Sequence, residues 1–226
     1  GQTSDNTRTI TAVANGSLTA TATTGSITQS GALKVTGTST FITIVADEDI
    51  TLEHTSNDFH DDVTFTTAGT RGDVAVYDSS DFYFGASTIN GNLEVETNNT
   101  GKANIGDEGI VTVSGTTDLS AAGTSNTKNA FIYMDDFAHV FRGGISARGH
   151  HVYLQLGGDS TDGGTALGTI YAARGKTEIT STSANGSLTQ TGPIQVNTDT
   201  TIWAGSNDVT LNHASNSFGG NSTSGV

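Results

Sequence analysis

The chain has 226 residues, of which 33% are hydrophobic and only 14% charged, and it contains 29 glycines and no cysteine. The formal net charge of −14 argues against nucleic acid or anionic membrane as a partner, because phosphate contacts need clustered Lys and Arg. The lack of cysteine excludes a disulfide scaffold and cysteine-based metal sites. No apolar stretch is long enough to span a bilayer, so we expect no membrane insertion.

Short strands are predicted along the whole chain, separated by Gly, Asn, Asp and Ser. Segments such as DITLEH (49–54), DVAVYD (73–78) and NLEVET (92–97) alternate apolar and polar residues with the two-residue period of a strand. No segment shows the 3.6-residue period of a helix. In chain order, the strands are expected to begin near Ile27, Ile50, Val74, Leu93, Ile110, Ile132, Val152, Ile170 and Leu188, with a mean spacing of about 20 residues.

The sequence repeats itself over long distances. Gly25–Val35 reads GSITQSGALKV, and Gly186–Val196 reads GSLTQTGPIQV, 161 positions later. Farther along, Asp49–Phe59 (DITLEHTSNDF) matches Asp208–Phe218 (DVTLNHASNSF). A weaker copy lies between them. We therefore predict one elongated domain over residues 1–226, built of modules of about 80 residues at approximately 18–92, 93–178 and a partial 179–226.

These strands and their spacing predict an all-β fold, a right-handed parallel β-helix (solenoid) with about 20 residues per coil. Inward Val, Ile, Leu and Phe then form a thin continuous core, which accounts for the low hydrophobic content. An antiparallel sandwich would need hairpin turns every 8–12 residues. A propeller would favour a period of about 40–50 residues. Both alternatives fit the observed spacing less well.

The residues also resemble a known family. The stretches GSITQSGALKVTGTSTF, DITLEHTSNDF and GDVAVYDSSDFYFGASTINGNLEVET look like the repeats of filamentous-haemagglutinin-type β-strand-repeat proteins, which are large secreted bacterial adhesins. The resemblance covers nearly the whole chain. It implies a rod-like β-helix, secretion to the cell surface, and roles in adhesion, biofilm aggregation or surface structure. It supplies no catalytic residues.

Acidic residues gather at the predicted turns. Calcium takes six to eight oxygen ligands, so Asp58, Asp61, Asp62, Asp135 and Asp136 are weak candidates for a Ca²⁺ site. The spacing of known calcium loops is absent. Ordinary turn chemistry and solubility explain the same residues more simply, so no cofactor is expected.

A second candidate region lies where the repeat is degenerate. Arg142, Arg148, His150, His151 and Tyr153 cluster in sequence, downstream of Asp135 and Asp136. Such a set could bind or cleave polysaccharide if it lined a groove, and it could equally be a lateral contact surface. Because adjacent strand residues point to opposite faces, His150 and His151 are not expected to meet. We predict no enzymatic activity and no catalytic residue.

Several other residues invite a structural interpretation. Phe59, Phe82, Phe137 and Phe218 recur in similar positions and are expected to stack in the core, and Trp203 is expected to be buried. His54 and His213 are equivalent in the repeat, which indicates a structural role. The tripeptide Arg71–Gly72–Asp73 matches an integrin-recognition motif that arises often by chance.

A β-helix has two open ends, and neither Gln2–Thr9 nor Phe218–Val226 resembles a cap. We therefore expect the chain to associate head to tail with copies of itself, or to adjoin further repeats of a longer chain. The expected function is a structural or adhesive component of an extracellular bacterial surface filament, with surface polysaccharide or a host receptor as a further partner. The alternative is a polysaccharide-binding or polysaccharide-degrading β-helix.

Overall fold

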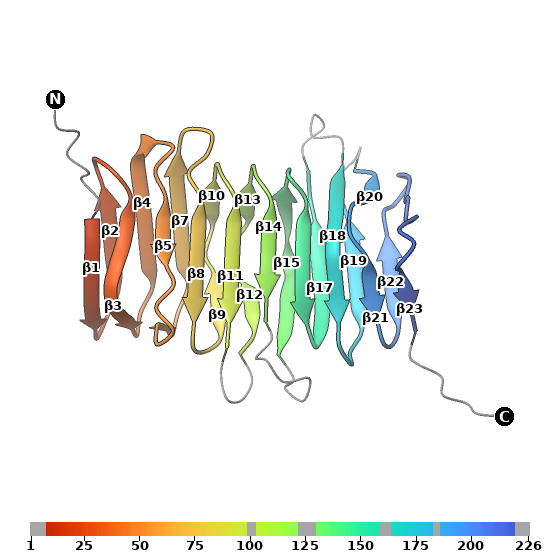
Figure 1. Cartoon of the computed structure of the whole chain (residues 1–226), viewed down its shortest axis with the longest axis horizontal. Coiled ribbons are helices and arrows are strands. Elements are labelled where there is room, and N and C mark those ends of the chain that lie inside the picture. The colour runs from red at the N-terminus through yellow and green to blue at the C-terminus, as the bar shows by residue number, and fades with distance from the viewer. Residues whose placement is uncertain (1–7, 99–102, 122–129, 159–163, 183–185, 220–226) are drawn as a thin grey trace.

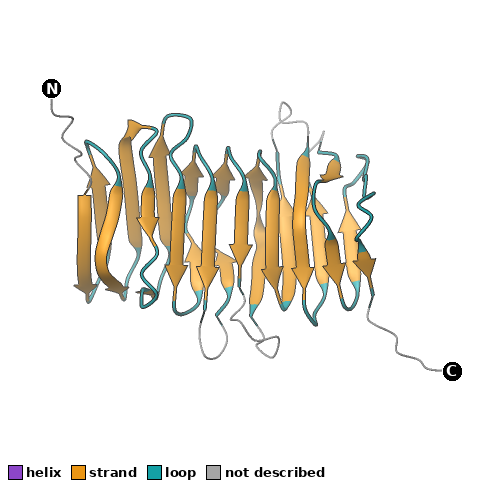
Figure 2. Cartoon of the chain, in the orientation of Figure 1, coloured by secondary structure: helices purple, strands orange, loops and turns teal. Residues whose placement is uncertain are grey.

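The computed structural model describes residues 8–98, 103–121, 130–158, 164–182 and 186–219, which form a parallel β-solenoid without any helix (Figures 1 and 2). The strand pairings between these residues are all parallel. The first and last turns lie at opposite ends of a rod (Figure 1). The predicted all-β solenoid is confirmed. Within these ranges there is no helix long and apolar enough to cross a membrane.

Two sheets face each other across the core. Sheet A, with twelve strands in the described ranges, comprises β1 (Arg8–Ala14), β3 (Ile27–Val35), β5 (Ile50–Leu52), β6 (Asp58–Phe59), β8 (Val74–Asp78), β11 (Leu93–Thr97), β14 (Thr117–Ser120), β16 (Ile145–Gly149), β18 (Thr165–Ala172), β20 (Leu188–Gln190), β21 (Ile194–Val196) and β23 (Ser217–Phe218). Sheet B, with eleven, comprises β2 (Leu18–Ala22), β4 (Ser39–Ala46), β7 (Val63–Ala68), β9 (Phe82–Phe84), β10 (Ser87–Ile89), β12 (Ile105–Asp107), β13 (Val111–Val113), β15 (Phe131–Phe141), β17 (His151–Leu156), β19 (Thr177–Ser181) and β22 (Thr200–Trp203).

The alternating sequence places like side chains in rows along the rod. In sheet A, Leu93 lies on Val74 and Val95 lies on Val76, and all four side chains are buried. Each buried side chain of this kind stabilises the fold by about 1.5–3 kcal/mol. The residues between them point outward. The core is therefore a continuous apolar column that only a few side chains per turn need to fill.

The turns are longer than predicted. Ile27 pairs with Ile50 and Ile50 with Val74, steps of 23 and 24 residues. The 161 residues from Ile27 to Leu188 make seven turns of about 23 residues, where the sequence suggested eight of about 20. The miscount arose because Ile132 and Val152 belong to sheet B. Both sheets alternate with the same two-residue period, so sequence alone does not distinguish their strands.

A column of polar side chains closes one corner of the solenoid. The Asp49 Oδ1 accepts the backbone N–H of Asp73 at 2.9 Å, and the Asp73 Oδ1 accepts that of Asn92 at 2.6 Å. Next, the Asn92 Oδ1 accepts the N–H of Thr116 at 2.9 Å. Each of these residues immediately precedes the first core residue of a sheet A strand. The column ties every turn to its successor without any buried charge pair.

Glycines stack beside this column. The backbone N–H of Gly91 donates to the carbonyl of Gly72, that of Gly115 to Gly91, and that of Gly143 to Gly115, at 2.8–3.1 Å. A Cβ on Gly115 would lie 2.6 Å from the Gly91 carbonyl oxygen. Glycine is required here because neighbouring backbones approach too closely for a side chain.

Candidate functional site

The duplicated sequence builds the same polar clamp twice. In the first copy, the side chain of Asn57 bonds Gln29 and also accepts the backbone N–H of Leu33 at 2.9 Å. In the second copy, Asn216 bonds Gln190 and accepts the N–H of Ile194 at 2.9 Å. The two segments are therefore structurally equivalent, and a residue in one can be compared with its counterpart in the other.

His54 and His213 belong to this clamp. The backbone N–H of His54 donates to Gln29, and the His54 Nδ1 accepts the N–H of Ser56 at 3.2 Å. The second copy repeats both bonds, since His213 donates to Gln190 and its Nδ1 accepts from Ser215 at 3.2 Å. Both imidazoles thus cap a turn, as their equivalence in the repeat indicated.

The two copies differ in what covers them. Phe59 is 1% exposed, because the next turn lies over it and the rings of Phe59 and Phe82 meet edge to face at 6.5 Å. Its counterpart Phe218 is 50% exposed, with no described turn beyond it. Phe41 is likewise covered by Phe65, whose ring stacks on it at 5.8 Å. The end of the rod is therefore a cross-section through the core.

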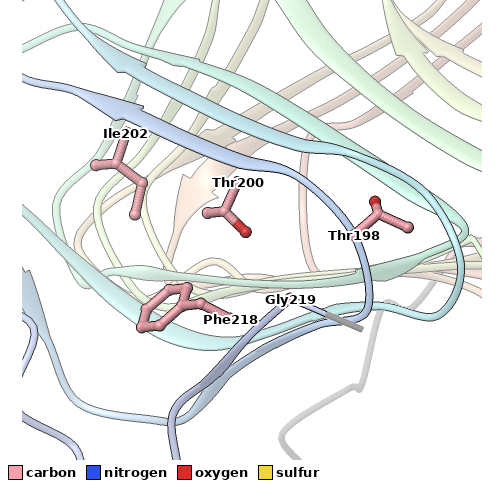
Figure 3. A pocket seen from close by; sticks show the side chains of 5 residues that line it. All are labelled: Thr198, Thr200, Ile202, Phe218 and Gly219. Carbon is pink, nitrogen blue, oxygen red and sulfur yellow. The ribbon is translucent and has the colours of Figure 1, made fainter. Parts of the chain in front are cut away.

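A shallow groove of about 390 Å³ occupies this open end. Figure 3 shows the side chains of Ile202 and Phe218 on facing strands, with Thr200 and Thr198 beside them. Ile202 stands at the repeat position of Phe41. The groove thus lies where the next turn of the first copy places its phenylalanines, and an apolar side chain fits it. Trp203, predicted to be buried, is 54% exposed on the outer side of β22.

The opposite end is also incompletely covered. Leu18 in β2 stands at the repeat position of Ile179 in β19. Ile179 is fully buried between two neighbouring strands, whereas Leu18 is only partly buried and pairs with β4 alone. Residues 1–7 and 220–226, at which uncapped ends were predicted, lie outside the described residues.

The expected cluster around residues 142–153 forms only in part. Arg148 lies on sheet A, with its guanidinium 6.0 Å from the centre of the Tyr171 ring. Arg142 follows the far end of β15 and borders Gly157 and Thr165. His150, His151 and Tyr153 do lie together, at the start of β17 on the outer side of sheet B.

The prediction that the two histidines point apart is wrong. Their ring centres are 4.9 Å apart, and both rings contact Phe131. His150 lies in the bend between β16 and β17, outside either strand, so the alternation of strand side chains does not apply to it.

Four rings form an aromatic cluster on sheet B, made by Phe131 and Tyr133 of β15 and by His151 and Tyr153 of β17. Their centres are 5.1 Å apart within β15, 5.9 Å apart within β17, and 4.7 and 5.5 Å apart between the strands. The rings tilt by 38° or less from one to the next. Parallel pairing in register created this cluster, and Phe131 and Tyr133 were missed because no sequence pattern links positions 20 residues apart.

Carboxylates border the cluster. Burial, together with the negative charges of Asp107, Asp136 and Glu178, raises the pKa of Asp135 above its usual value. The pKa values of Tyr133 and Tyr153 are also raised, mainly by burial and further by neighbours that include Asp135. Desolvation and nearby cationic groups lower the pKa values of His150 and His151. The surface is therefore acidic at its tyrosine side.

A buried pair lies behind this face and was not predicted. The Nδ1 of His139 accepts the backbone N–H of Val111 at 3.0 Å, which places the ring hydrogen on Nε2. That Nε2–H donates to the Asp107 Oδ2 at 3.1 Å, and both side chains are inaccessible to solvent. The His139 ring stacks on Phe141 with a centroid distance of 5.9 Å. The pair occupies the core at the irregular part of β15, where the repeat is degenerate.

The calcium candidates are spread over separate places. Asp58 bonds His60 and Ser80, while Asp61 accepts the backbone N–H of Asp62. Asp135 and Asp136 lie on β15, apart from that turn. Among the described residues, no three or more acidic or histidine side chains are placed to hold a metal ion. Calcium binding stays a prediction without a defined site.

Two further sequence predictions have clear outcomes. The carboxylate of Asp73 in the Arg71–Gly72–Asp73 tripeptide is bonded to the next turn, so its role in the structure is that of a corner residue. Phe59 and Phe82 are buried and in contact, as expected, but Phe137 and Phe218 are exposed. The recurrence of phenylalanine in the sequence therefore does not by itself place the ring in the core.

One family model matches the chain three times, at residues 2–66, 71–147 and 154–225, and it is described as repeats of unknown function (DUF5649). The chain belongs to this family. Its matches together span nearly the whole sequence, which agrees with a solenoid made of successive repeats. The chain matches no curated protein and no solved structure.

Proposed function

We propose that the chain is a structural and adhesive module of an extracellular bacterial surface filament, of the filamentous-haemagglutinin type. Such a filament lengthens when a further solenoid turn stacks on the open end. That turn comes from another copy of the chain or from an adjoining repeat. The proposal assigns the chain no catalytic role.

The contrast between Phe59 and Phe218 carries this proposal. At the same position of the repeat, one ring is sealed by the next turn and the other is half exposed. Exposed strand edges and an uncovered core both favour addition of another turn. Because the two ends of a solenoid are different surfaces, head-to-tail stacking does not close on itself and produces a fibre. The acidic, Thr-rich sides of the rod favour solubility between filaments.

The test is association of the purified chain, followed by analytical ultracentrifugation and electron microscopy. We expect linear assemblies that lengthen with concentration. The variant Phe218→Asp places a charge in the end groove and is expected to shorten them, because an unpaired charge would be buried at the junction. Ile44→Asp adds the same charge at an exposed position on the side of the rod and is the matched control. Discrete monomers at high concentration, or equal effects of the two variants, would refute end-to-end stacking.

A further inference from the structure

We propose that the aromatic cluster of sheet B binds a linear polysaccharide of amino sugars, which lies across β15 and β17 on the outer surface. This inference goes beyond the filament role and does not depend on stacking at the ends. It rests on the arrangement of the rings, the flatness of the surface and the charges around it.

The cluster is an exposed aromatic surface, which is unusual on this molecule. Outward positions of the neighbouring strands carry residues such as Thr112, Ser146 and Thr180. Tyr133, by contrast, is 38% exposed although its ring offers a large apolar area. Sugar rings combine an apolar C–H face with a hydroxyl edge, and tyrosines offer a matching apolar ring and polar tip. An exposed apolar patch with a polar rim is typical of a binding surface.

The shape of the surface favours a chain over a single small molecule. The described residues of this cluster line none of the cavities found in the structure, and a small ligand normally needs an enclosing pocket. Along the rod, Tyr83 is followed by Gly106, then Tyr133 and Tyr153. A Cβ on Gly106 would lie 2.8 Å from the Tyr83 ring, so this ring covers the glycine. The tyrosine row therefore spans three inter-strand steps, roughly 14 Å.

The charges favour an amino sugar over a neutral or acidic one. Asp135, Asp136 and Glu178 are exposed carboxylates close enough to influence one another or the tyrosines. A protonated amine held here gains attraction from these carboxylates and from the faces of the aromatic rings. Arg174 and Lys176 lie by the histidines, at the other edge of the cluster. A uronic acid polymer would meet repulsion at the tyrosine side.

The experiment is calorimetric titration of the full chain with a glucosamine hexamer at low salt. We expect saturable binding. The double variant Tyr133→Thr/Tyr153→Thr puts the residue typical of outward positions in place of both rings, and it should weaken binding by about tenfold or more. Tyr171→Thr removes a tyrosine from sheet A and is the control, with affinity expected to stay within about twofold. All three proteins carry the same net charge.

Several outcomes would overturn the proposal. Equal binding by the double variant and the Tyr171→Thr control would reduce the effect to general attraction by an acidic protein. An N-acetylglucosamine hexamer that binds as tightly would remove the role of the amine, and no binding of either hexamer at millimolar concentration would remove the site. If the double variant does not fold, Glu178→Gln decides the question, since unchanged affinity contradicts the charge argument. Tyrosine variants that alter side-by-side association without altering glycan binding would assign the cluster to contacts between rods.

Discussion

Asn57 and Gln29, 28 residues apart in the chain, hold each other through two side-chain hydrogen bonds. The Gln29 Nε2 donates to the Asn57 Oδ1 at 2.8 Å, and the Asn57 Nδ2 donates to the Gln29 Oε1 at 3.0 Å. Asn57 also donates to the backbone carbonyls of Leu52 and Tyr77. One buried amide thus joins three successive turns, and Gln190 with Asn216 reproduces the pairing at the end of the rod.

Replacement of Asn57 by alanine is expected to lower the free energy of unfolding by about 2–4 kcal/mol, because buried backbone groups lose their partner. Asn216→Ala is the matched variant. Asn216 has no described turn beyond it and makes fewer of these bonds, so its loss should cost less than half as much. Urea denaturation followed by circular dichroism measures both changes. Equal costs would show that the bond to Tyr77 contributes nothing.

Stability should depend on pH through Asp78. Burial raises the pKa of this carboxyl to about 7, and the hydrogen bonds from Phe59 and Ser80 offset the shift only in part. Between pH 4 and 7 the folded state therefore holds a proton that the unfolded state has released. The contribution is fully present below the unfolded value and is lost as the pH rises to about 7, by at most roughly 4 kcal/mol.

Thermal unfolding between pH 4.5 and 8 tests this dependence. Asp78→Asn cannot titrate, so its unfolding midpoint should vary less over this range than that of the native chain. The variant should also be less stable overall, because an amide nitrogen would face a backbone N–H donor at one of the two oxygen positions. A native chain that becomes more stable from pH 5 to 7, with the same slope in the variant, would exclude Asp78 as the cause.

The glycine column should not tolerate side chains. Gly115→Ala would place a Cβ 2.6 Å from the Gly91 carbonyl oxygen, and overpacking of this kind costs about 1–3 kcal/mol. Gly16→Ala is the control, since a Cβ there meets no atom within 4 Å. Thermal denaturation of both variants separates the contact from the general effect of replacing glycine. Similar midpoints for the two would show that the corner relaxes to admit a methyl group.

A grafted turn should seal the open end. Residues 61–85 form the turn that covers the first copy, so they should cover the second copy when they replace residues 220–226. Burial of Phe218 is expected to raise the unfolding temperature by about 5 °C. The same graft with serine in place of Phe65 and Phe82 is the control. If both grafts act alike, added length rather than contact with Phe218 and Ile202 explains the change.

The sequence predicted the fold class because its information is local. The alternation in DITLEH and NLEVET, with turn residues between strands, suffices to predict short parallel strands once the repeat is seen. The length of a turn was less accessible, since strands of the two sheets alternate alike. Ile132 and Val152 could be separated from the sheet A row only by their pairing with each other.

The surface features depended on register, which is not local. Tyr133 and Tyr153 stack because their strands pair at a step of 20 residues, whereas Thr117 and Ile145 pair at a step of 28. A difference of this size decides which outward side chains meet, and nothing in the sequence near either residue announces it. The corner residues Asp73 and Asn92, in contrast, could be found from their position before each strand.

The corner column implies that the length of the protein is open to change. Each Asp, Asn or Ser there needs only the amide of its immediate neighbour, whichever neighbour that is. Gene duplication or slippage that adds or removes one whole lap would therefore leave every remaining junction intact. Related chains of this family should differ in size by complete circuits of the backbone, with partial circuits selected against.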